Sequence, residues 1–482
     1  MLHKYVTIIH NTLALAIPNV LNPIISFLLV LVISRYIGVE GLGEYSLVLS
    51  YLAIFSTLAS MGLGDLCVRE VAKESSQAHT YLVNAVTMGI LSSIVAIVAM
   101  NVMIVAMDYE SEIIWAGAVC SFSILPSTAI VFMEAIFRSL EKSYFVAITF
   151  VIENIVRVGI CVLLILTGHG VVPVFTAILA TRIFGMLLMF FFYVRVNGFP
   201  RAAFNMGILQ LLIAEAPTFA SIAIFSTIHL SVDQIMLSKL QSLQAVGLYS
   251  SADRLLSICK TIPVAFSSAL LTFFSKELIT SKGNLRGLCI NSLRFTAIIV
   301  FPVVIGTCVL ADKFILLLYG SEFAVAGSIL QIHIISLIPF SMVYILAQVL
   351  IATNNQRVDL AINVAAALVN VLLNFLLIPI FGTMGAVVAT LVTIVLFNQA
   401  QYWYIQKQLF SLPILDAMHK PLVASIMMGI FTFLLKEQSI ILTITASAAV
   451  YGVLLFLTKT LKVEEIHAIL NLIGISSHKD GL

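Results

Sequence analysis

Charged residues are scarce in this chain. Only 10% of its 482 residues are Asp, Glu, Lys or Arg, and 61% are hydrophobic. Soluble domains carry about 25% charged and about 45–50% apolar residues. Residues 82–107 and 326–351 contain no charged side chain at all. No soluble core can hide so much apolar surface, so the composition excludes a soluble protein. The formal net charge of +2 gives no reason to expect a nucleic-acid partner.

Sequence motifs of enzymes and of ATP-driven machines are also absent. The chain has no Walker A sequence, no Gly-x-Ser-x-Gly elbow and no His/Cys metal spacing. We therefore expect no cofactor and no metal, and any energy input must come from an ion gradient or from the substrate. The connectors near 65–81, 195–211 and 273–287 are the longest, and they are too short to house a catalytic domain. The six cysteines lie in or beside apolar stretches and are expected to act as small core residues.

Long apolar runs dominate what remains. Each is about 20 residues long, the length that crosses the hydrocarbon layer of a bilayer. The first run is too long for the apolar core of a signal peptide and shows no cleavage pattern, so we expect it to stay in the protein. The sequence predicts an all-α polytopic membrane protein with about 14 transmembrane helices. These spans lie near residues 12–34, 43–64, 82–107, 113–137, 144–166, 171–194, 212–237, 245–272, 288–310, 326–351, 359–379, 384–406, 417–435 and 439–458.

Lysine and arginine residues gather on one side of these spans. With the N-terminus inside, the outer connectors hold only four of the 25 basic residues, Arg35, Lys239, Lys313 and Lys436. Four more basic residues lie within spans, and the rest are on the inner side. The positive-inside rule therefore predicts that both termini are cytoplasmic.

The chain also repeats itself. Residues 34–46 line up with residues 238–250, so that Gly43 and Gly247 correspond, as do Ser46 and Ser250. Further matches join Ser123 and Pro126 to Ser336 and Pro339, and Ala180 and Thr181 to Ala389 and Thr390. Each repeat would hold six spans, an even number, so both copies enter the bilayer from the same side. We predict two parallel six-helix bundles around a central cavity, residues 1–200 and 201–410, followed by two additional helices and a cytoplasmic tail in residues 411–482.

Polar residues inside the spans fall on narrow stripes. On the eighth span a strip about 60° wide contains Ser250, Arg254, Ser257, Thr261, Ser268 and Thr272. An ionised residue facing lipid at mid-bilayer costs about 2.5–3.5 kcal/mol, so we expect these spans to line a hydrated cavity. The predicted substrate-binding residues are Arg254, Arg182, Lys260, Asn19, Asn22, Ser50, Thr57, Ser257 and Thr261.

The seventh span carries a stripe of titratable residues. Glu215, His229 and Asp233 fall within about 80° of one another around a helix. We hypothesise that they couple transport to protons or sodium ions. The alternative is structural: Glu215 and Asp233 lie near opposite helix ends, where water can reach them, and His229 would be a satisfied core residue.

The other charged residues inside the spans also have two interpretations. Glu153 and Arg157 are spaced i, i+4, so we interpret them as a structural ion pair. Arg182 and Arg254 have no oppositely charged neighbour at i±3 or i±4, which favours substrate contact. Lys260 lies on the side of Asp253, so both pairing and substrate contact stay open for it.

Two paired motifs resemble those of a known family. Residues 35–38 and 41–46, with 62–64 and 68–70, resemble the opening of bacterial O-antigen and polysaccharide flippases. Residues 233–239, 245–250 and 254–255 resemble the second-half signature of the same family, which belongs to the multidrug/oligosaccharidyl-lipid/polysaccharide exporter superfamily. The resemblance covers about residues 10–410.

The resemblance implies a flippase of the inner membrane, with no enzymatic activity. Its substrate would be a polyprenyl-pyrophosphate-linked oligosaccharide, turned from the cytoplasmic to the periplasmic leaflet by alternating access. Arg254 would receive the pyrophosphate, and the last two spans would form a groove for the lipid tail. Membrane lipid, a polysaccharide polymerase and a chain-length regulator are the partners implied.

Two other functions remain open. One is a cation-coupled multidrug antiporter of the same superfamily, although the first span lacks the acidic residue that such antiporters commonly use. The other, a membrane-embedded glycosyltransferase or polymerase, fits less well because no outer connector is large enough to hold a catalytic cluster.

Overall fold

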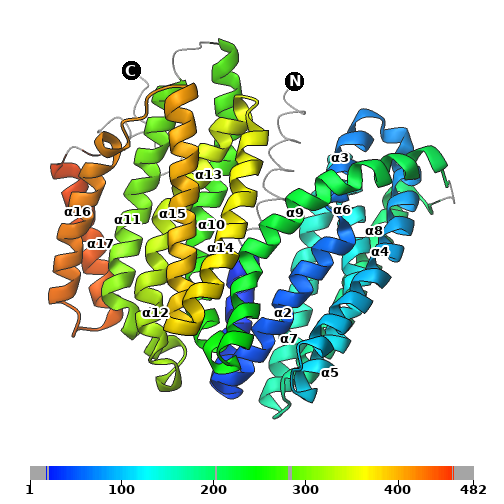
Figure 1. Cartoon of the computed structure of the whole chain (residues 1–482), viewed down its shortest axis with the longest axis horizontal. Coiled ribbons are helices and arrows are strands. Elements are labelled where there is room, and N and C mark those ends of the chain that lie inside the picture. The colour runs from blue at the N-terminus through cyan, green and yellow to red at the C-terminus, as the bar shows by residue number, and fades with distance from the viewer. Residues whose placement is uncertain (1–17, 19–20, 201–203, 281–284, 459, 461–482) are drawn as a thin grey trace, which may run out of the picture. The chain divides into compact units, whose positions relative to one another are not determined.

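The computed structural model describes residues 18, 21–200, 204–280, 285–458 and 460, and nearly all of them are helical (Figure 1). Thirteen helical segments of this part are long and apolar enough to cross a membrane. A shorter apolar helix, Leu21–Tyr36, coincides with the second half of the predicted first span, and the residues before it lie outside the described part. The predicted all-α fold with about fourteen spans is confirmed.

The helices of the first half follow the predicted spans closely. Inside lipid, the backbone of each uncharged tract has no water to bind. A single tract can then satisfy its own backbone hydrogen bonds only by forming a helix. The elements are α2 (Gly38–Ser60), α3 (Leu63–Lys73), η1 (Ser75–Gln77), α4 (Ala78–Ala106), α5 (Ser111–Ser121), α6 (Ile124–Ser139), α7 (Tyr144–Leu166) and α8 (Val171–Asn197).

The second half contains the longer helices. Prolines lie inside five of them, at Pro217, Pro263, Pro302, Pro379 and Pro421. The elements are α9 (Met206–Leu240), α10 (Leu243–Thr280), α11 (Leu285–Leu318), η2 (Ser321–Phe323), α12 (Ala326–His333), η3 (Ile334–Ser336), α13 (Leu337–Ala352), α14 (Gln356–Phe381), α15 (Thr383–Gln408), α16 (Ile414–Leu434) and α17 (Ile440–Leu457).

Two predicted spans are each divided into two helices. The span near 113–137 breaks between α5 and α6, and the span near 326–351 breaks between α12 and α13. In both, the proline that the repeat aligns, Pro126 or Pro339, is the third residue of the helix after the break. A proline is tolerated in the first turn of a helix but not in its interior, so the helix restarts just before it. The internal repeat is therefore seen both in the sequence and in the positions where these helices break.

The surface of α4 shows the inverted polarity of a membrane helix. Leu91, Val95, Val98 and Val102 recur at helical spacing and are 57–68% exposed. The small polar Ser93 on the same helix is fully buried. A helix that exposes its apolar side chains and buries its polar ones is suited to lipid rather than to water.

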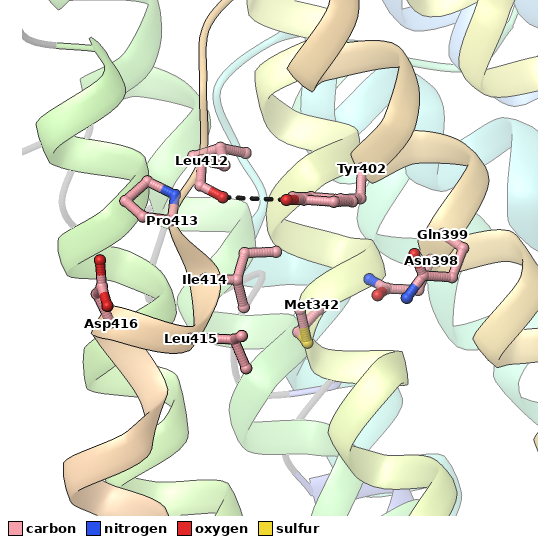
Figure 2. Close-up of a pocket in the computed structure, with 9 residues that line it drawn as sticks. All are labelled: Met342, Asn398, Gln399, Tyr402, Leu412, Pro413, Ile414, Leu415 and Asp416. Carbon is pink, nitrogen blue, oxygen red and sulfur yellow. Dashed lines mark hydrogen bonds between the residues drawn. The ribbon is translucent and has the colours of Figure 1, made fainter.

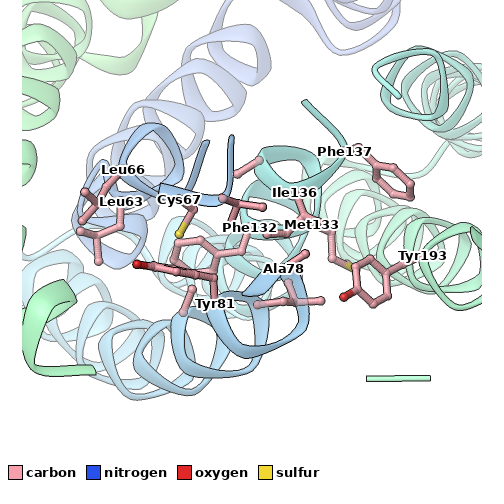
Figure 3. Close-up of a cluster of buried hydrophobic side chains, with 14 of the residues drawn as sticks. Leu63, Leu66, Cys67, Ala78, Tyr81, Phe132, Met133, Ile136, Phe137 and Tyr193 are labelled. Atoms are coloured by element: carbon pink, nitrogen blue, oxygen red, sulfur yellow. The ribbon is translucent and has the colours of Figure 1, made fainter. Parts of the chain in front are cut away.

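The chain packs into two compact units. Unit 1 consists of Met1–Thr261, Ile315–Ile329 and Leu360–Thr393. Inside it α2 packs against α9, α4, α6 and α5. Its largest described core joins α3, α4, α6 and α8 through Leu63, Cys67, Tyr81, Phe132, Phe137 and Tyr193, among others (Figure 3).

Unit 2 consists of Ile262–Phe314, Leu330–Asp359 and Ile394–Leu482. Its core joins α10, α11, α13 and α15 through Phe274, Leu293, Leu346 and Ile405. A smaller cluster holds α16 against α17 through Met428 and Tyr451. The predicted division of the chain at residues 200 and 410 stays a prediction, because these units group the helices by contact rather than by repeat.

Candidate functional site

The carboxylate of Asp233 lies at the centre of a buried polar cluster in unit 1. Asp233 is on α9 and only 4% exposed. The hydroxyls of Tyr249 and Thr390 each donate to its Oδ2 at 2.7 Å, and Asn374 Nδ2 donates to its Oδ1 at 2.6 Å. These partners come from α10, α15 and α14, so one carboxylate joins four helices.

Two asparagines extend this cluster along α14. Asn374 Nδ2 also donates to Asn370 Oδ1 at 3.2 Å, and both asparagines are fully buried. Asn374 Oδ1 and Asn370 Nδ2 have no hydrogen-bond partner among the described residues. The cluster therefore combines one carboxylate with hydroxyl and amide oxygens, and part of its hydrogen-bonding capacity is unused. We call Asp233, Tyr249, Asn370, Asn374 and Thr390 the Asp233 cluster.

Glu215 does not belong to the Asp233 cluster. It lies on the same helix, α9, but 18 residues earlier, which is about 27 Å along the axis. It is half-buried, two residues before Pro217. The side chain of His229 lies outside the described part of the structure. Of the three residues predicted for ion coupling, only Asp233 is thus placed among polar partners from other helices.

Glu153 pairs with a different arginine from the one the sequence suggested. Arg182 Nη1 on α8 lies 3.0 Å from Glu153 Oε1 on α7, whereas Arg157 donates from Nη2 to Asn154 Oδ1. The predicted partner of Glu153 is therefore corrected. The reason is geometric: Gly185 on α8 has no side chain, and a Cβ there would stand 2.4 Å from Glu153 Oε2. The carboxylate fits against α8 and meets Arg182, one turn away.

Arg157 and Arg254 approach the same tyrosine. Tyr45 on α2 is 5% exposed and stacks on Phe175, with ring centroids 5.7 Å apart. The charges of Arg157 on α7 and Arg254 on α10 both act on the Tyr45 hydroxyl. Arg254 is half-buried, and no described residue forms a hydrogen bond or ion pair with its guanidinium group. Two arginines on different helices thus contribute positive charge at one buried hydroxyl, which helical spacing alone did not reveal.

The predicted hydroxyl residues divide into two groups. Ser50 donates to Gln234 Oε1 at 2.6 Å, and Thr57 is 3.0 Å from the Thr227 hydroxyl, so both join α2 to α9. Ser257 and Thr261 instead donate to carbonyl oxygens of their own helix, one turn earlier. A serine or threonine bonded in this way keeps a lone pair for another donor.

The remaining predicted residues are placed as follows. Asn22 is exposed on the helix Leu21–Tyr36 and accepts a hydrogen bond from Ser26 at 3.4 Å. Asn19 lies outside the described residues. Lys260 is half-buried on α10.

Unit 2 contains a separate cavity of about 470 Å³. It lies between α13, α15 and the start of α16, and none of the predicted site residues lines it. Figure 2 shows its wall, where the Tyr402 hydroxyl donates to the Leu412 carbonyl oxygen at 3.3 Å. Asn398 faces it with a buried amide nitrogen that has no partner in the described structure.

The partners of Asp233 are not predicted by the sequence patterns. Asn370 and Asn374 are spaced i, i+4 in an otherwise apolar stretch, and that spacing was the available signal. Thr390 had been singled out only as evidence for the repeat. Tyr249 stood in the repeated motif at residues 245–250. Nothing local connects these residues to Asp233, because the contacts span up to 157 positions of the chain.

Comparison with known proteins supports the family resemblance. The sequence profile described as "Polysaccharide biosynthesis protein" matches residues 8–277, and the profile described as "MatE" matches residues 217–376. The chain is 28% identical over 236 residues to the probable flippase AglR of Haloferax volcanii, covering 46% of this chain and 49% of AglR. It is 29% identical over 146 residues to the probable low-salt glycan biosynthesis flippase Agl15 of the same organism, covering 30% and 31%. The chain thus matches half or less of the length of these curated relatives.

Solved structures share the fold at low sequence identity. The lipid II flippase MurJ in an inward closed conformation has a TM-score of 0.77 at 15% identity, covering 92% of this chain and 98% of MurJ. An inward-facing multidrug resistance MATE transporter of the MOP superfamily has a TM-score of 0.64 at 14% identity, covering 81% and 98%. These similarities establish the fold. With the family profile matching more than half of its length, this chain belongs to the polysaccharide biosynthesis protein family.

Proposed function

We propose that this protein is a flippase for polyprenyl-pyrophosphate-linked oligosaccharides. It would carry the polar headgroup from the cytoplasmic to the outer leaflet while the polyprenyl tail stays in lipid. A glycan cannot cross hydrocarbon unaided, because its hydroxyls would lose their water without gaining other partners. The relatives AglR and Agl15 are described as probable flippases, and this description supports the proposal.

The main support for the proposal is that the guanidinium group of Arg254 is half-buried without a partner among the described residues. A guanidinium on a membrane helix costs free energy unless water or an anion compensates it. Arg254 is half-buried and has no protein partner among the described residues, and Arg157 acts on the same Tyr45 hydroxyl. Arginine binds phosphate oxygens in a planar, two-pronged geometry. A pyrophosphate is an anion that would suit such a pair.

Arg182 has a smaller part in this proposal. Its ion pair with Glu153 holds α7 against α8, so it would support Arg157 rather than contact the substrate first. Lys260, Asn22, Ser257 and Thr261 remain proposed contacts for sugar hydroxyls. Ser257 and Thr261 are suited to this role because each oxygen can accept a further hydrogen bond.

Ion coupling is proposed at the Asp233 cluster. Small hard cations are bound in proteins by carboxylate, hydroxyl and amide oxygens, and these are the groups that surround Asp233. A half-turn of the Asn374 amide would present its unused Oδ1 in place of Nδ2. A sodium ion would then replace the donated hydrogen bonds, whereas a proton would neutralise the carboxylate. Either event changes what holds α9, α10, α14 and α15 together, which is a means of coupling to alternating access.

The proposed setting is the cytoplasmic membrane, with both termini in the cytoplasm. Lipid surrounds the apolar helix faces, and α16 and α17 would guide the lipid tail. A polysaccharide polymerase and a chain-length regulator are the proposed partners downstream of flipping.

A second candidate is a cation-coupled multidrug antiporter. The MatE profile over residues 217–376 and the MATE-like fold favour it, and so does the buried carboxylate of Asp233 on α9. Resistance of cells that express the chain to cationic drugs would distinguish it from a flippase.

The test of the proposed function is a deletion strain. We expect a lipid-linked oligosaccharide to accumulate with its headgroup on the cytoplasmic leaflet, and the wild-type chain to restore its appearance outside. Accumulation of the intermediate on the outer leaflet would contradict a role in flipping and would indicate a later step.

A further inference from the structure

Two basic residues at repeat-related positions each bind the end of a helix from the other repeat. Arg35, the penultimate residue of the helix Leu21–Tyr36, donates from Nε to the Leu318 carbonyl oxygen at 2.9 Å and from Nη2 to that of Leu317. Lys239, the penultimate residue of α9, lies 3.4 Å from the Asp108 carbonyl oxygen and 3.6 Å from the centroid of the Tyr109 ring. Residues 35 and 239 occupy matching positions in the repeated motif.

The acceptors of both contacts lie at or just after the end of a helix. Leu317 and Leu318 are the last two residues of α11, and Asp108 follows the end of α4 by two positions. The last carbonyl groups of a helix lack intrahelical donors and carry the negative end of its dipole. A cation is therefore a natural partner for each helix end. In both cases the cation comes from the other repeat.

A backbone contact between the same two repeats lies beside these cations. A Cβ on Gly43 of α2 would stand 2.0 Å from the Leu243 carbonyl oxygen, and a Cβ on Gly247 of α10 would stand 2.0 Å from that of Val39. Gly43 matches Gly247 in the repeat, and Val39 matches Leu243 by the same offset. The contact is thus reciprocal, with each repeat offering a glycine to a carbonyl of the other. All of these residues belong to unit 1.

We propose that Arg35 and Lys239 are a pair of latches that hold the outer ends of the two repeats closed. The inference rests on the proposed transport by alternating access, because a closed outer end has a role only if it opens during the cycle. By the positive-inside assignment, Arg35 and Lys239 lie in outer connectors. Neither latch binds a carboxylate among the described residues: both bind main-chain carbonyls, and Lys239 also faces the Tyr109 ring, so each can release and re-form without leaving an anion uncompensated.

The two latches differ in the hydrogen bonds of the tyrosine that lies beside each of them. The Tyr109 hydroxyl lies 2.7 Å from the Ser238 hydroxyl and 3.2 Å from that of Tyr51, which adds a hydrogen-bonded chain to the Lys239 latch. Tyr319, which follows the Arg35 acceptors, is 2% exposed, and its hydroxyl has no partner in the described part of the chain. Tyr51 and Tyr109 belong to the same repeat, so opening at either latch breaks two of these hydrogen bonds between the repeats.

The test measures access to a buried position behind the latches. Ser46 lies one turn after Gly43 on α2 and is fully buried. We would introduce Ser46→Cys and follow its reaction with a membrane-impermeant maleimide, added from one side at a time, in liposomes without glycolipid or ion gradient. The chain with only its six native cysteines, none of them exposed, provides the background.

We expect Arg35→Gln and Lys239→Gln each to raise the rate of labelling from outside by about threefold to tenfold, and the double variant to raise it further. Lys313→Gln is the matched control, since Lys313 is also a predicted outer lysine that donates to a carbonyl, that of Gln438 at 2.9 Å, and lies elsewhere. Tyr109→Phe should raise labelling less than Lys239→Gln, because the ring still faces the cation. Gly247→Ala should raise the labelling rate most, if the variant folds. The Arg35 and Lys239 variants change only exposed side chains, so they keep the test valid if Gly247→Ala does not fold.

Unchanged labelling in the Arg35 and Lys239 double variant, or an increase only from the cytoplasmic side, would overturn the latch assignment. Because the assay contains no substrate, it separates the latches from the proposed function. A chain that gates as expected but flips no glycolipid would refute the flippase and leave the latches standing.

Discussion

The three arginines inside the predicted spans of unit 1 differ in what compensates their charge. Arg182 has a carboxylate, Arg157 has an asparagine, and Arg254 has no partner in the described structure. Removing a partner from a buried ion pair leaves an uncompensated charge and destabilises the fold. Removing Arg254 leaves no protein group without its partner. Substitutions at Arg182 should therefore affect stability, whereas substitutions at Arg254 should affect transport.

Arg254→Glu is expected to lower the rate of flipping by about 10-fold to 100-fold, because a carboxylate repels the pyrophosphate that the arginine would bind. Arg254→Lys, which keeps the charge and loses the two-pronged geometry, should retain an intermediate rate. The measurement is glycolipid flipping in proteoliposomes that contain equal amounts of each variant. Arg286→Gln is the control, since Arg286 is exposed and, among the described residues, donates to the Ser411 carbonyl oxygen rather than to a side chain. A wild-type rate for Arg254→Glu would remove Arg254 from the proposed site.

Asp233→Asn tests the proposed coupling site at the same scale. The amide keeps the shape of the carboxylate but removes its charge, so neither a sodium ion nor a proton can be bound as before. We expect transport by this variant to lose its dependence on an imposed proton or sodium gradient, with a fall of about tenfold or more in the driven rate.

Glu215→Gln serves as the comparison for Asp233. Glu215 lies on the same helix without the partners of the Asp233 cluster, so its variant should keep gradient dependence. The reverse pattern, with dependence lost in Glu215→Gln and kept in Asp233→Asn, would move the coupling site along α9. Wild-type transport that ignores both gradients would reject ion coupling altogether.

At the scale of elements, close packing of α7 on α8 depends on one glycine. Gly185→Ala places a methyl group 2.4 Å from the present position of Glu153 Oε2. The carboxylate must then move away from Arg182. We expect the variant to lose about 1–3 kcal/mol of stability. The measurement is the midpoint of thermal unfolding in detergent.

Gly159→Ala on α7 is the matched control for Gly185→Ala. A Cβ at residue 159 meets nothing within 4 Å, and alanine is a better helix former than glycine by about 1 kcal/mol. This variant should unfold at the same temperature as the wild type or higher. Equal midpoints for the two variants would show that the packing of Glu153 against α8 does not limit stability.

At the scale of the whole molecule, the remaining test concerns orientation. We expect a fluorescent reporter fused after residue 482 to mature in the cytoplasm, and a cysteine at Lys436, between α16 and α17, to react with an impermeant reagent from outside. The pair of measurements fixes the side of the last two helices. A cytoplasmic Lys436 would invert the assignment and would place the latches at the inner face.

Periodicity and composition predicted the helices well because a membrane removes most alternatives. Inside hydrocarbon a backbone must satisfy its own hydrogen bonds, so an uncharged run of sufficient length has one structure to adopt. Residues 144–166 were predicted as a span and form a helix with the same bounds. The helix breaks before Pro126 and Pro339 were less visible, although the repeat had already aligned those prolines.

The site was only partly predictable for the same physical reason. Helical spacing tells which residues share a face, and it identified Asp233 and Arg254, but it does not tell what packs against that face. Glu153 was assigned to its neighbour Arg157 because i, i+4 was the only geometry available from sequence. The residues that surround Asp233 come from three other helices, and no local pattern relates them.

The sequence by itself determined that this chain crosses a membrane many times, that it is built from a repeat, and which charged residues are hidden in its spans. These features follow from the cost of transferring polar groups into hydrocarbon, which acts residue by residue. Only the tertiary structure decided which arginine Glu153 binds, which helices close around Asp233, and that Gly43 and Gly247 face each other's repeat. Those outcomes depend on steric fit between helices distant in the chain, and such fit is a property of the packed molecule.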